Sequence, residues 1–354
     1  MTTANSAEPI AGDVLPRTTR AMIVFNPVAG QAETLAHDIQ IASEIWQEHG
    51  WHVNIRPTAA PGDGSRIARE AAALGYDLVV AAGGDGTINE VVNGLAGTQT
   101  ALAPLPAGTV NVWAREIGLP LNPRATAEAL LHARIRRIDL GRAGDRYFLL
   151  MAGVGFDAAV VNQVRSSEKR RFGIFAYLIR IFETARRFRG VRAQITIDGR
   201  RVRRRVLLVV LGNSQLYGGV MKMTARATID DGLLDVCIIK GTSLLSAPRI
   251  VLAILLQRHT VDPSIEYYRA RTVSVDARTT MPVQVDGDHI GTTPMSFEAV
   301  PGALSVLMPS ELESDLLRIE RPVRRRAWQR AIGWISRRLA RLIPAAYRRR
   351  GAEL

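Results

Sequence analysis

The feature that most constrains the fold of this 354-residue chain is a glycine-rich turn within LVVAAGGDGTINEVVNGL, residues 78–95. Five apolar residues precede the turn, as is typical of a buried strand. Its glycines lack a Cβ, so the backbone can bend sharply and an anion can approach the amide groups. Thr87 and Glu90 have the spacing of a capping box, which predicts that a helix begins directly after the turn. The free amides and positive dipole end of such a helix attract phosphate, so we predict an anion site here.

The turn belongs to a repeating pattern, because short apolar runs alternate with stretches of helical period over residues 21–150. We expect strands at 21–25, 51–56, 78–82, 102–105 and 137–140, and helices at 33–48, 65–74, 88–95 and 126–133. Strands that alternate with helices predict a doubly wound α/β domain, with a parallel sheet covered on both faces. Ligands bind beyond the carboxyl ends of the strands in such sheets, and the glycine turn follows one of those ends.

A second pattern begins after about residue 145, where β-rich runs follow one another. Asp198 and Gly199 separate two of these runs as the turn of a hairpin does. We expect strands at 194–197, 202–211, 234–239, 272–276, 283–285 and 304–308, with helical stretches at 172–188 and 248–256. The predicted fold class is therefore α/β in the first domain, followed by a mainly antiparallel β domain.

Positive charge is concentrated near the C-terminus. The formal net charge is +13, and residues 318–354 hold twelve arginines and two glutamates, a net charge of +10. The remainder is nearly neutral, which argues against a general nucleic-acid-binding protein. Apolar side chains within 318–350 share one helical face: Trp328, Ile332, Ile335, Leu339, Leu342 and Ile343. This pattern predicts a basic amphipathic tail on an anionic membrane surface, and the alternatives are a helix packed on the core or a solvated tail.

Other classes are excluded by cysteine usage and by the length of apolar runs. Cys237 is the only cysteine, which excludes an internal disulfide and a cysteine-based metal site. The longest apolar runs, 206–211 and 250–256, are far shorter than the ~20 residues of a membrane-spanning helix. Residues 1–19 lack the apolar region of a signal peptide. We therefore expect a disordered leader and a cytoplasmic protein, peripheral on the cytosolic face of the membrane.

Five segments together point to a known family. They are FNPVAG at 25–30, GGDGT at 83–87, PAGTVN at 106–111, IDDGLLD at 229–235 and VDGD at 285–288. In this order they resemble the diacylglycerol-kinase catalytic-domain family, which includes bacterial lipid kinases and the sphingosine and ceramide kinases. The resemblance implies an α/β ATP-binding domain at 20–145 with a return strand at 298–310. It also implies a β-sandwich domain at 146–297 and an active cleft between the two domains.

The resemblance further implies residues for ATP, for Mg²⁺ and for proton transfer. Those implied to contact ATP are Asn26, Thr58, Gly83, Gly84, Asp85, Gly86, Thr87, Ile88, Asn89, Gly108 and Thr109. Asp231, with the backbone carbonyls of Thr228 and Leu233, is implied to hold a structural Mg²⁺. Asp288 stands at the position of the family's glutamate general base, and Asp85 is implied to act through the catalytic Mg²⁺. Because the matching aspartate is the base in sphingosine kinases, Asp85 and Asp288 are both candidates for that role.

The leading hypothesis is an ATP- and Mg²⁺-dependent kinase of phospholipid biosynthesis, acting on a hydroxyl of a diacylglycerol- or sphingoid-type membrane lipid. Its alternatives are a soluble kinase of the NAD-kinase type and a catalytically inactive, membrane-bound sensor of nucleotide or lipid. The sensor hypothesis draws on Asp288, one methylene shorter than glutamate, and on Val112, where many bacterial lipid kinases have aspartate. Asp286 and Gly287 have the pattern of an ordinary hairpin turn. The sequence predicts neither a nucleic-acid partner nor an oligomeric state.

Overall fold

The computed structural model describes residues 14–28, 32–108, 110–156, 158, 189–217, 221–242, 262–310 and 316–317. They belong to one unit, Met1–Leu317. Several predicted features lie outside the described residues: most of the leader, the helical stretches at 172–188 and 248–256, Thr109 and the tail at 318–350. In the part of the chain that is described, no helix combines the length and the apolar composition of a membrane span.

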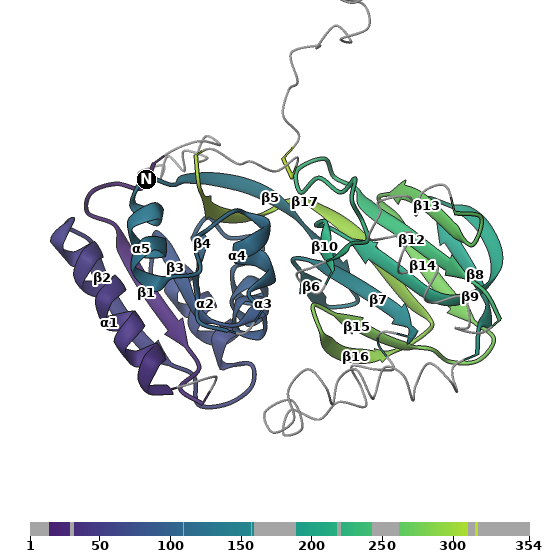
Figure 1. Cartoon of the computed structure of the whole chain (residues 1–354), viewed down its shortest axis with the longest axis horizontal. Coiled ribbons are helices and arrows are strands. Elements are labelled where there is room, and N and C mark those ends of the chain that lie inside the picture. The colour runs from purple at the N-terminus through teal and green to yellow at the C-terminus, as the bar shows by residue number, and fades with distance from the viewer. Residues whose placement is uncertain are drawn as a thin grey trace, which may run out of the picture. The chain divides into compact units, whose positions relative to one another are not determined.

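The first half of the chain forms a parallel sheet in the order β4-β3-β1-β2 (Figure 1). Its strands are β1 Arg20–Phe25, β2 His52–Pro57, β3 Leu78–Gly83 and β4 Ala101–Pro106. Its helices are α1 Ala32–Glu48, α2 Asp63–Ala73, α3 Asp85–Leu95, α4 Val112–Glu116 and α5 Pro123–Leu131. Every residue of β3 and β4 is buried, as expected of central strands covered on both faces. Helix α1 packs against α5, and α2 packs against α3.

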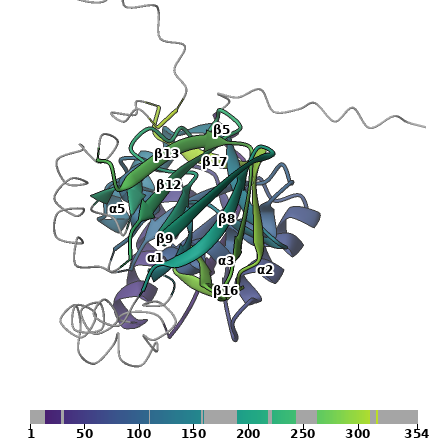
Figure 2. The same cartoon turned by 90° about the vertical axis from the view of Figure 1, so that its right-hand side faces the viewer.

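The second half is built mainly from antiparallel strands. They are β5 Arg134–Ala143, β6 Arg146–Phe148, β7 Met151–Gly155, β8 Val191–Ile197, β9 Arg200–Gly212, β10 Leu216–Tyr217, β11 Met221–Lys222, β12 Leu234–Lys240, β13 Ile265–Ala270, β14 Thr272–Ala277, β15 Pro282–Val285 and β16 Asp288–Thr292. Strands β13, β12, β9 and β8 lie side by side in that order (Figure 2). Asp198 and Gly199 form the predicted turn between β8 and β9, with positive φ at both residues (44° and 82°), as a type I′ turn requires.

Two long strands connect the halves. β17, Met295–Met308, pairs with β14 through its first residues and runs parallel to β4 at Ser305 and Val306. β5 runs antiparallel to β17 from one half into the other. A hydrogen-bonded path of strands therefore extends from β16 in the second half to β2 in the first.

The start of α3 differs from the prediction. The helix begins at Asp85, two residues before Thr87, and no side chain caps it. The carboxylate of Glu90 instead accepts hydrogen bonds from the amides of Gly62 (3.0 Å) and Gly64 (2.8 Å), at the start of α2. The predicted capping box is wrong because amides brought in by tertiary packing compete successfully for Glu90.

Other elements also differ from the sequence expectation, among them β5 and α4. Strand β5 extends the predicted 137–140 in both directions, because it pairs with β17 over that whole length. Helix α4 follows the loop after β4 and has no counterpart among the predicted elements. Five residues are too few for an apolar period to reveal a helix.

Candidate active site

A cavity of about 540 Å³ lies at the carboxyl ends of β1 and β2 and the N-terminus of α3. We call it the loop cavity, because its walls are residues 26–28, residues 58–61, the first turns of α3 and Asp288 at the start of β16. Six residues predicted from the sequence line it: Asn26, Thr58, Gly84, Gly86, Thr87 and Asp288. The fold thus brings segments of both halves to the edge of the parallel sheet where ligands of such sheets bind.

Two close approaches shape the glycine turn. A Cβ on Gly83 would lie 2.6 Å from Oγ1 of Thr87, so this side chain folds back over the turn. A Cβ on Gly108 would lie 2.6 Å from Cα of Gly84, so the loop after β4 presses directly against the turn. The Asn111 side chain holds that loop, since it accepts from Gly108 N (2.9 Å) and donates to Gly108 O (2.8 Å). Predicted residue Gly108 therefore supports the turn through backbone contact.

Gly108→Ala is expected to lower the free energy of unfolding by about 1–3 kcal/mol, because its methyl group would overlap the backbone of Gly84. Gly86→Ala is the matched control. A Cβ at Gly86 meets no atom within 4 Å, and alanine favours a helix by up to about 1 kcal/mol. Urea unfolding of both variants measures the difference, and equal midpoints would contradict the close approach of the two loops.

Asp85 begins α3, and its carboxylate anchors the next helix. Oδ1 accepts a hydrogen bond from Val112 N at 2.8 Å and lies 3.5 Å from Trp113 N, at the start of α4. Burial raises the pKa of Asp85, and hydrogen bonds from these amides partly oppose the rise. Asp85 is not among the described residues that line the loop cavity. Its visible role is to fix α4 to the glycine turn.

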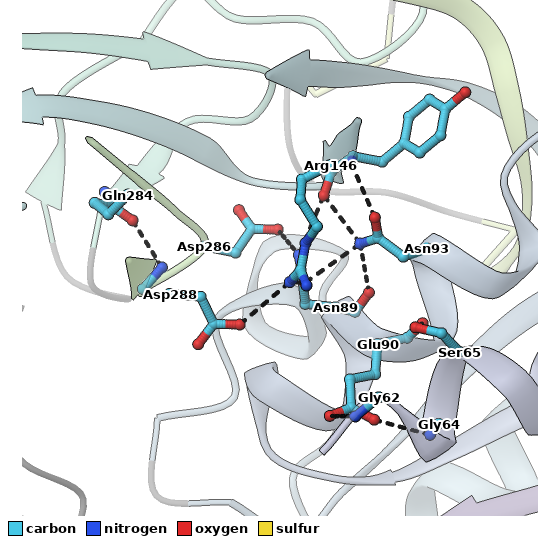
Figure 3. A network of polar contacts seen from close by, with 12 residues as sticks. Gly62, Gly64, Ser65, Asn89, Glu90, Asn93, Arg146, Gln284, Asp286 and Asp288 are labelled. Atoms are coloured by element: carbon cyan, nitrogen blue, oxygen red, sulfur yellow. Dashed lines mark hydrogen bonds and ion pairs between the residues drawn. The ribbon is translucent and has the colours of Figure 1, made fainter. Parts of the chain in front are cut away.

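Three other predicted ATP ligands are buried rather than facing the loop cavity. Gly83 ends the fully buried strand β3, and Ile88 is 2% exposed in the hydrophobic core. Asn89 is 1% exposed, and its amide takes part in a polar network (Figure 3). In this structure these three residues are part of the buried interior next to the glycine turn and do not line the loop cavity.

The Asp286 carboxylate, for which the sequence predicts only a place in a turn, joins that network through Asn89 (Figure 3). Oδ1 accepts from the amides of Leu150 (3.0 Å) and Met151 (2.9 Å). Oδ2 accepts from the amide of Leu149 (2.8 Å) and from Nδ2 of Asn89 (2.9 Å). Burial raises the pKa of Asp286 to about 6, although the four donors act in the opposite direction. The residue does sit in the β15–β16 turn, and from there it ties α3 to the segment before β7.

Arg146 connects this network to Asp288, the candidate general base, and the sequence did not predict this role. Its Nη2 donates to Oδ1 of Asn89 (3.0 Å) and lies 3.5 Å from Oδ2 of Asp288 (Figure 3). The Arg146 and Asp288 side chains are 44% and 55% exposed, so their ion pair orients the carboxylate more than it stabilises the fold. Nothing in the pattern of the three-residue strand β6 singles out Arg146.

The predicted Mg²⁺ ligands lie elsewhere, in the loop before β12. The Asp231 side chain is 6% exposed, and its Oδ1 accepts from Leu233 N at 3.0 Å. Its Oδ2 accepts from the Thr228 hydroxyl and from Nη2 of Arg269. Among the described residues, no three His, Cys, Asp or Glu side chains are grouped to hold a metal ion. In this structure the cation in contact with the Asp231 carboxylate is the guanidinium of Arg269.

Two family models match the chain in succession. The diacylglycerol kinase catalytic domain matches residues 20–143. The YegS C-terminal NAD kinase beta sandwich-like domain matches residues 151–308. With the strand arrangement described above, these matches confirm the predicted fold class, an α/β domain followed by a β-sandwich-like domain.

Individual relatives agree with the family models. The chain is 31% identical over 300 residues to the diacylglycerol kinase of Bacillus subtilis (strain 168), covering 84% of this chain and 99% of that protein. It is 30% identical to the diacylglycerol kinase of Staphylococcus saprophyticus over 300 residues, covering 84% and 97%. The crystal structure of a diacylglycerol kinase from Bacillus anthracis str. Sterne matches it with a TM-score of 0.68 at 25% identity, covering 83% and 98%. The resemblance predicted from the sequence is confirmed, and the chain belongs to the diacylglycerol kinase family of phosphotransferases that act on an alcohol group.

Proposed function

We propose that this chain is an ATP- and Mg²⁺-dependent kinase that transfers the γ-phosphate to a hydroxyl of a diacylglycerol- or sphingoid-type lipid. The observation that carries the proposal is the loop cavity, in which Asp288 and the glycine turn of α3 share one space. A helix N-terminus that binds phosphate and a carboxylate that orients the acceptor hydroxyl are what phosphoryl transfer requires of a protein. The names of the relatives support a diacylglycerol acceptor.

Each part of the loop cavity has a role in this mechanism. The backbone of Gly84 and Gly86 binds the phosphates of ATP, with Asn26 and Thr58 on the opposite loops. Asp288 accepts the proton of the attacking hydroxyl, and Arg146 holds that carboxylate in position. Asp85, which lies at the glycine turn outside the cavity wall, is the carboxylate that would act with Mg²⁺, and the metal would offset the phosphate charge.

Asp288→Asn is expected to lower kcat for lipid phosphorylation by about 100-fold to 10,000-fold, the usual contribution of a general base. The measurement uses radiolabelled ATP, Mg²⁺ and mixed micelles that contain diacylglycerol, monoacylglycerol, sphingosine or ceramide. Asp288→Glu restores the length of the family's glutamate and is the matched control, expected to remain active. A fully active Asp288→Asn protein would show that another group acts as the general base. No labelled lipid from the unmodified chain would overturn the proposal.

The same assay separates the alternatives. Labelled NAD in place of labelled lipid would support the NAD-kinase hypothesis, and ATP binding without any product would support the inactive sensor. One ground for the sensor hypothesis is weakened by the position of Val112, which is 6% exposed and packs in the hydrophobic core. Val112 contributes its backbone amide to Asp85, and any residue other than proline could supply that donor.

We also propose that the enzyme works on the cytosolic face of the membrane, attached through the basic tail at 318–350. The twelve arginines of residues 318–354, with apolar residues at helical spacing among them in the sequence, support this attachment. A kinase whose acceptor lies in a bilayer requires such a surface. Repeating the assay with anionic and with neutral vesicles tests this part, since equal rates on both would contradict it.

A further inference from the structure

A group of buried carboxylates surrounds the loop that precedes β12. Asp231 lies within the loop and Asp235 on the strand that follows, with side chains 6% and 0% exposed. Asp139 of β5 accepts a hydrogen bond (2.6 Å) from the backbone amide of Gly232, which belongs to the same loop. Carboxylates removed from water to this degree are stabilised in their charged form by hydrogen-bond donors or by a nearby positive charge.

Arg269 supplies such a charge. It lies on β13 directly opposite Asp235 in the antiparallel pairing with β12, so the two side chains share one face of the sheet. Its Nη2 donates a hydrogen bond to Oδ2 of Asp231, and its Nε lies 3.5 Å from Oδ2 of Asp235. One planar guanidinium thus bonds Asp231 and lies within ion-pair distance of Asp235, whose buried Oδ2 has no hydrogen-bond partner. The hydroxyl of Tyr267 completes the arrangement by donating to Oδ1 of Asp235 at 2.6 Å.

We propose that Arg269 takes the place of the structural Mg²⁺ that the family resemblance assigns to this loop. The guanidinium offsets part of the negative charge of Asp231 and Asp235, while Asp139 fixes the loop backbone through Gly232. The order of the loop is then independent of divalent cations. This inference concerns the second half of the chain alone and goes beyond the proposed function, so it holds or fails independently of kinase activity.

Thermal unfolding of the full chain without nucleotide tests the proposal. The wild-type midpoint is expected to be the same in EDTA and in millimolar MgCl₂. Arg269→Met is expected to lower the midpoint in EDTA by roughly 5 °C, and Mg²⁺ is expected to restore much of the loss. Adding Asp231→Asn to Arg269→Met should abolish the response to Mg²⁺. Arg271→Met, an exposed arginine two residues further along, is the matched control and should behave like wild type.

Two results would overturn the proposal. The first is a wild-type midpoint that rises with Mg²⁺ and loses this response in Asp231→Asn. The second is an Arg269→Met protein whose midpoint in EDTA equals that of wild type. If Arg269→Met does not fold, Arg269→Lys keeps the charge without the planar fork. A Mg²⁺-dependent midpoint in Arg269→Lys would then support the proposal, and a midpoint equal to that of wild type in EDTA would overturn it.

Discussion

Asp286→Ala is expected to lower the free energy of unfolding by about 3–5 kcal/mol, the usual cost of removing one partner from a buried charged network. The substitution leaves three consecutive backbone amides, from Leu149 to Met151, and the side-chain amide of Asn89 without their acceptor. Alanine is also strained at the φ of 46° found at this position, whereas asparagine tolerates it. Asp286→Asn is therefore expected to lose roughly half as much stability. Urea unfolding measures both variants.

Asp288→Asn is the matched control for this experiment, because it makes the same change of charge two residues away on a side chain that is 55% exposed. Its free energy of unfolding should differ from that of wild type by less than about 0.5 kcal/mol. Asp286 variants with wild-type midpoints would show that the four hydrogen bonds do not stabilise the fold.

The pH dependence of stability provides a second readout for Asp286. Burial raises its pKa from 3.8 to about 6, so the folded protein binds this proton more tightly than the unfolded chain does. The stabilisation that comes from the protonated carboxyl is complete below about pH 4 and is lost as the pH rises to about 6. Asp286→Ala should remove this part of the wild-type pH profile.

Asp85→Asn is expected to lower kcat for lipid phosphorylation by at least about 100-fold while leaving the fold intact. Asparagine keeps an oxygen that can accept from Val112 N, so α4 stays attached to the glycine turn. What is lost is the negative charge that the proposed mechanism requires beside the phosphates. Asp85→Ala removes both the charge and the anchor, and should lose stability as well as activity.

Comparing the two Asp85 variants separates structure from chemistry. Kinase assays at saturating ATP report the chemical step, and urea unfolding reports the attachment of α4. An Asp85→Asn protein within about tenfold of wild-type kcat would show that Asp85 acts only as the anchor seen in the structure. An inactive Asp85→Asn protein with wild-type stability would support the proposed role with Mg²⁺.

The parallel sheet and the glycine turn could be predicted because their signals are local. β3 and β4 are buried on both faces, so each appears in the sequence as an apolar run, and the turn follows β3 directly. The six predicted residues of the loop cavity came from the family resemblance, which rests on five short segments of the chain. Local pattern therefore predicted the fold class, and the resemblance predicted much of the cavity wall.

The features that were missed depend on contacts between distant parts of the chain. The donors to Asp286 lie 135 to 137 residues before it on the backbone, and Asn89 lies 197 residues before it. Glu90 fits a capping box by spacing, but its carboxylate is taken by amides 26 and 28 residues away. Arg146 reaches Asp288 across 142 residues. A single sequence carries no signal for which of these partners a polar side chain will choose.

The pairing of β17 with β4 also sets an order of events during synthesis. Ala101 of β4 leaves the ribosome about 200 residues before its partner Ser305, because translation proceeds from the N-terminus. In that interval the parallel sheet exposes one edge with unpaired backbone groups, and such an edge readily recruits strands from other chains. A partly synthesised chain, even one that already contains every phosphate-binding loop, is therefore prone to aggregate until β17 pairs with β4.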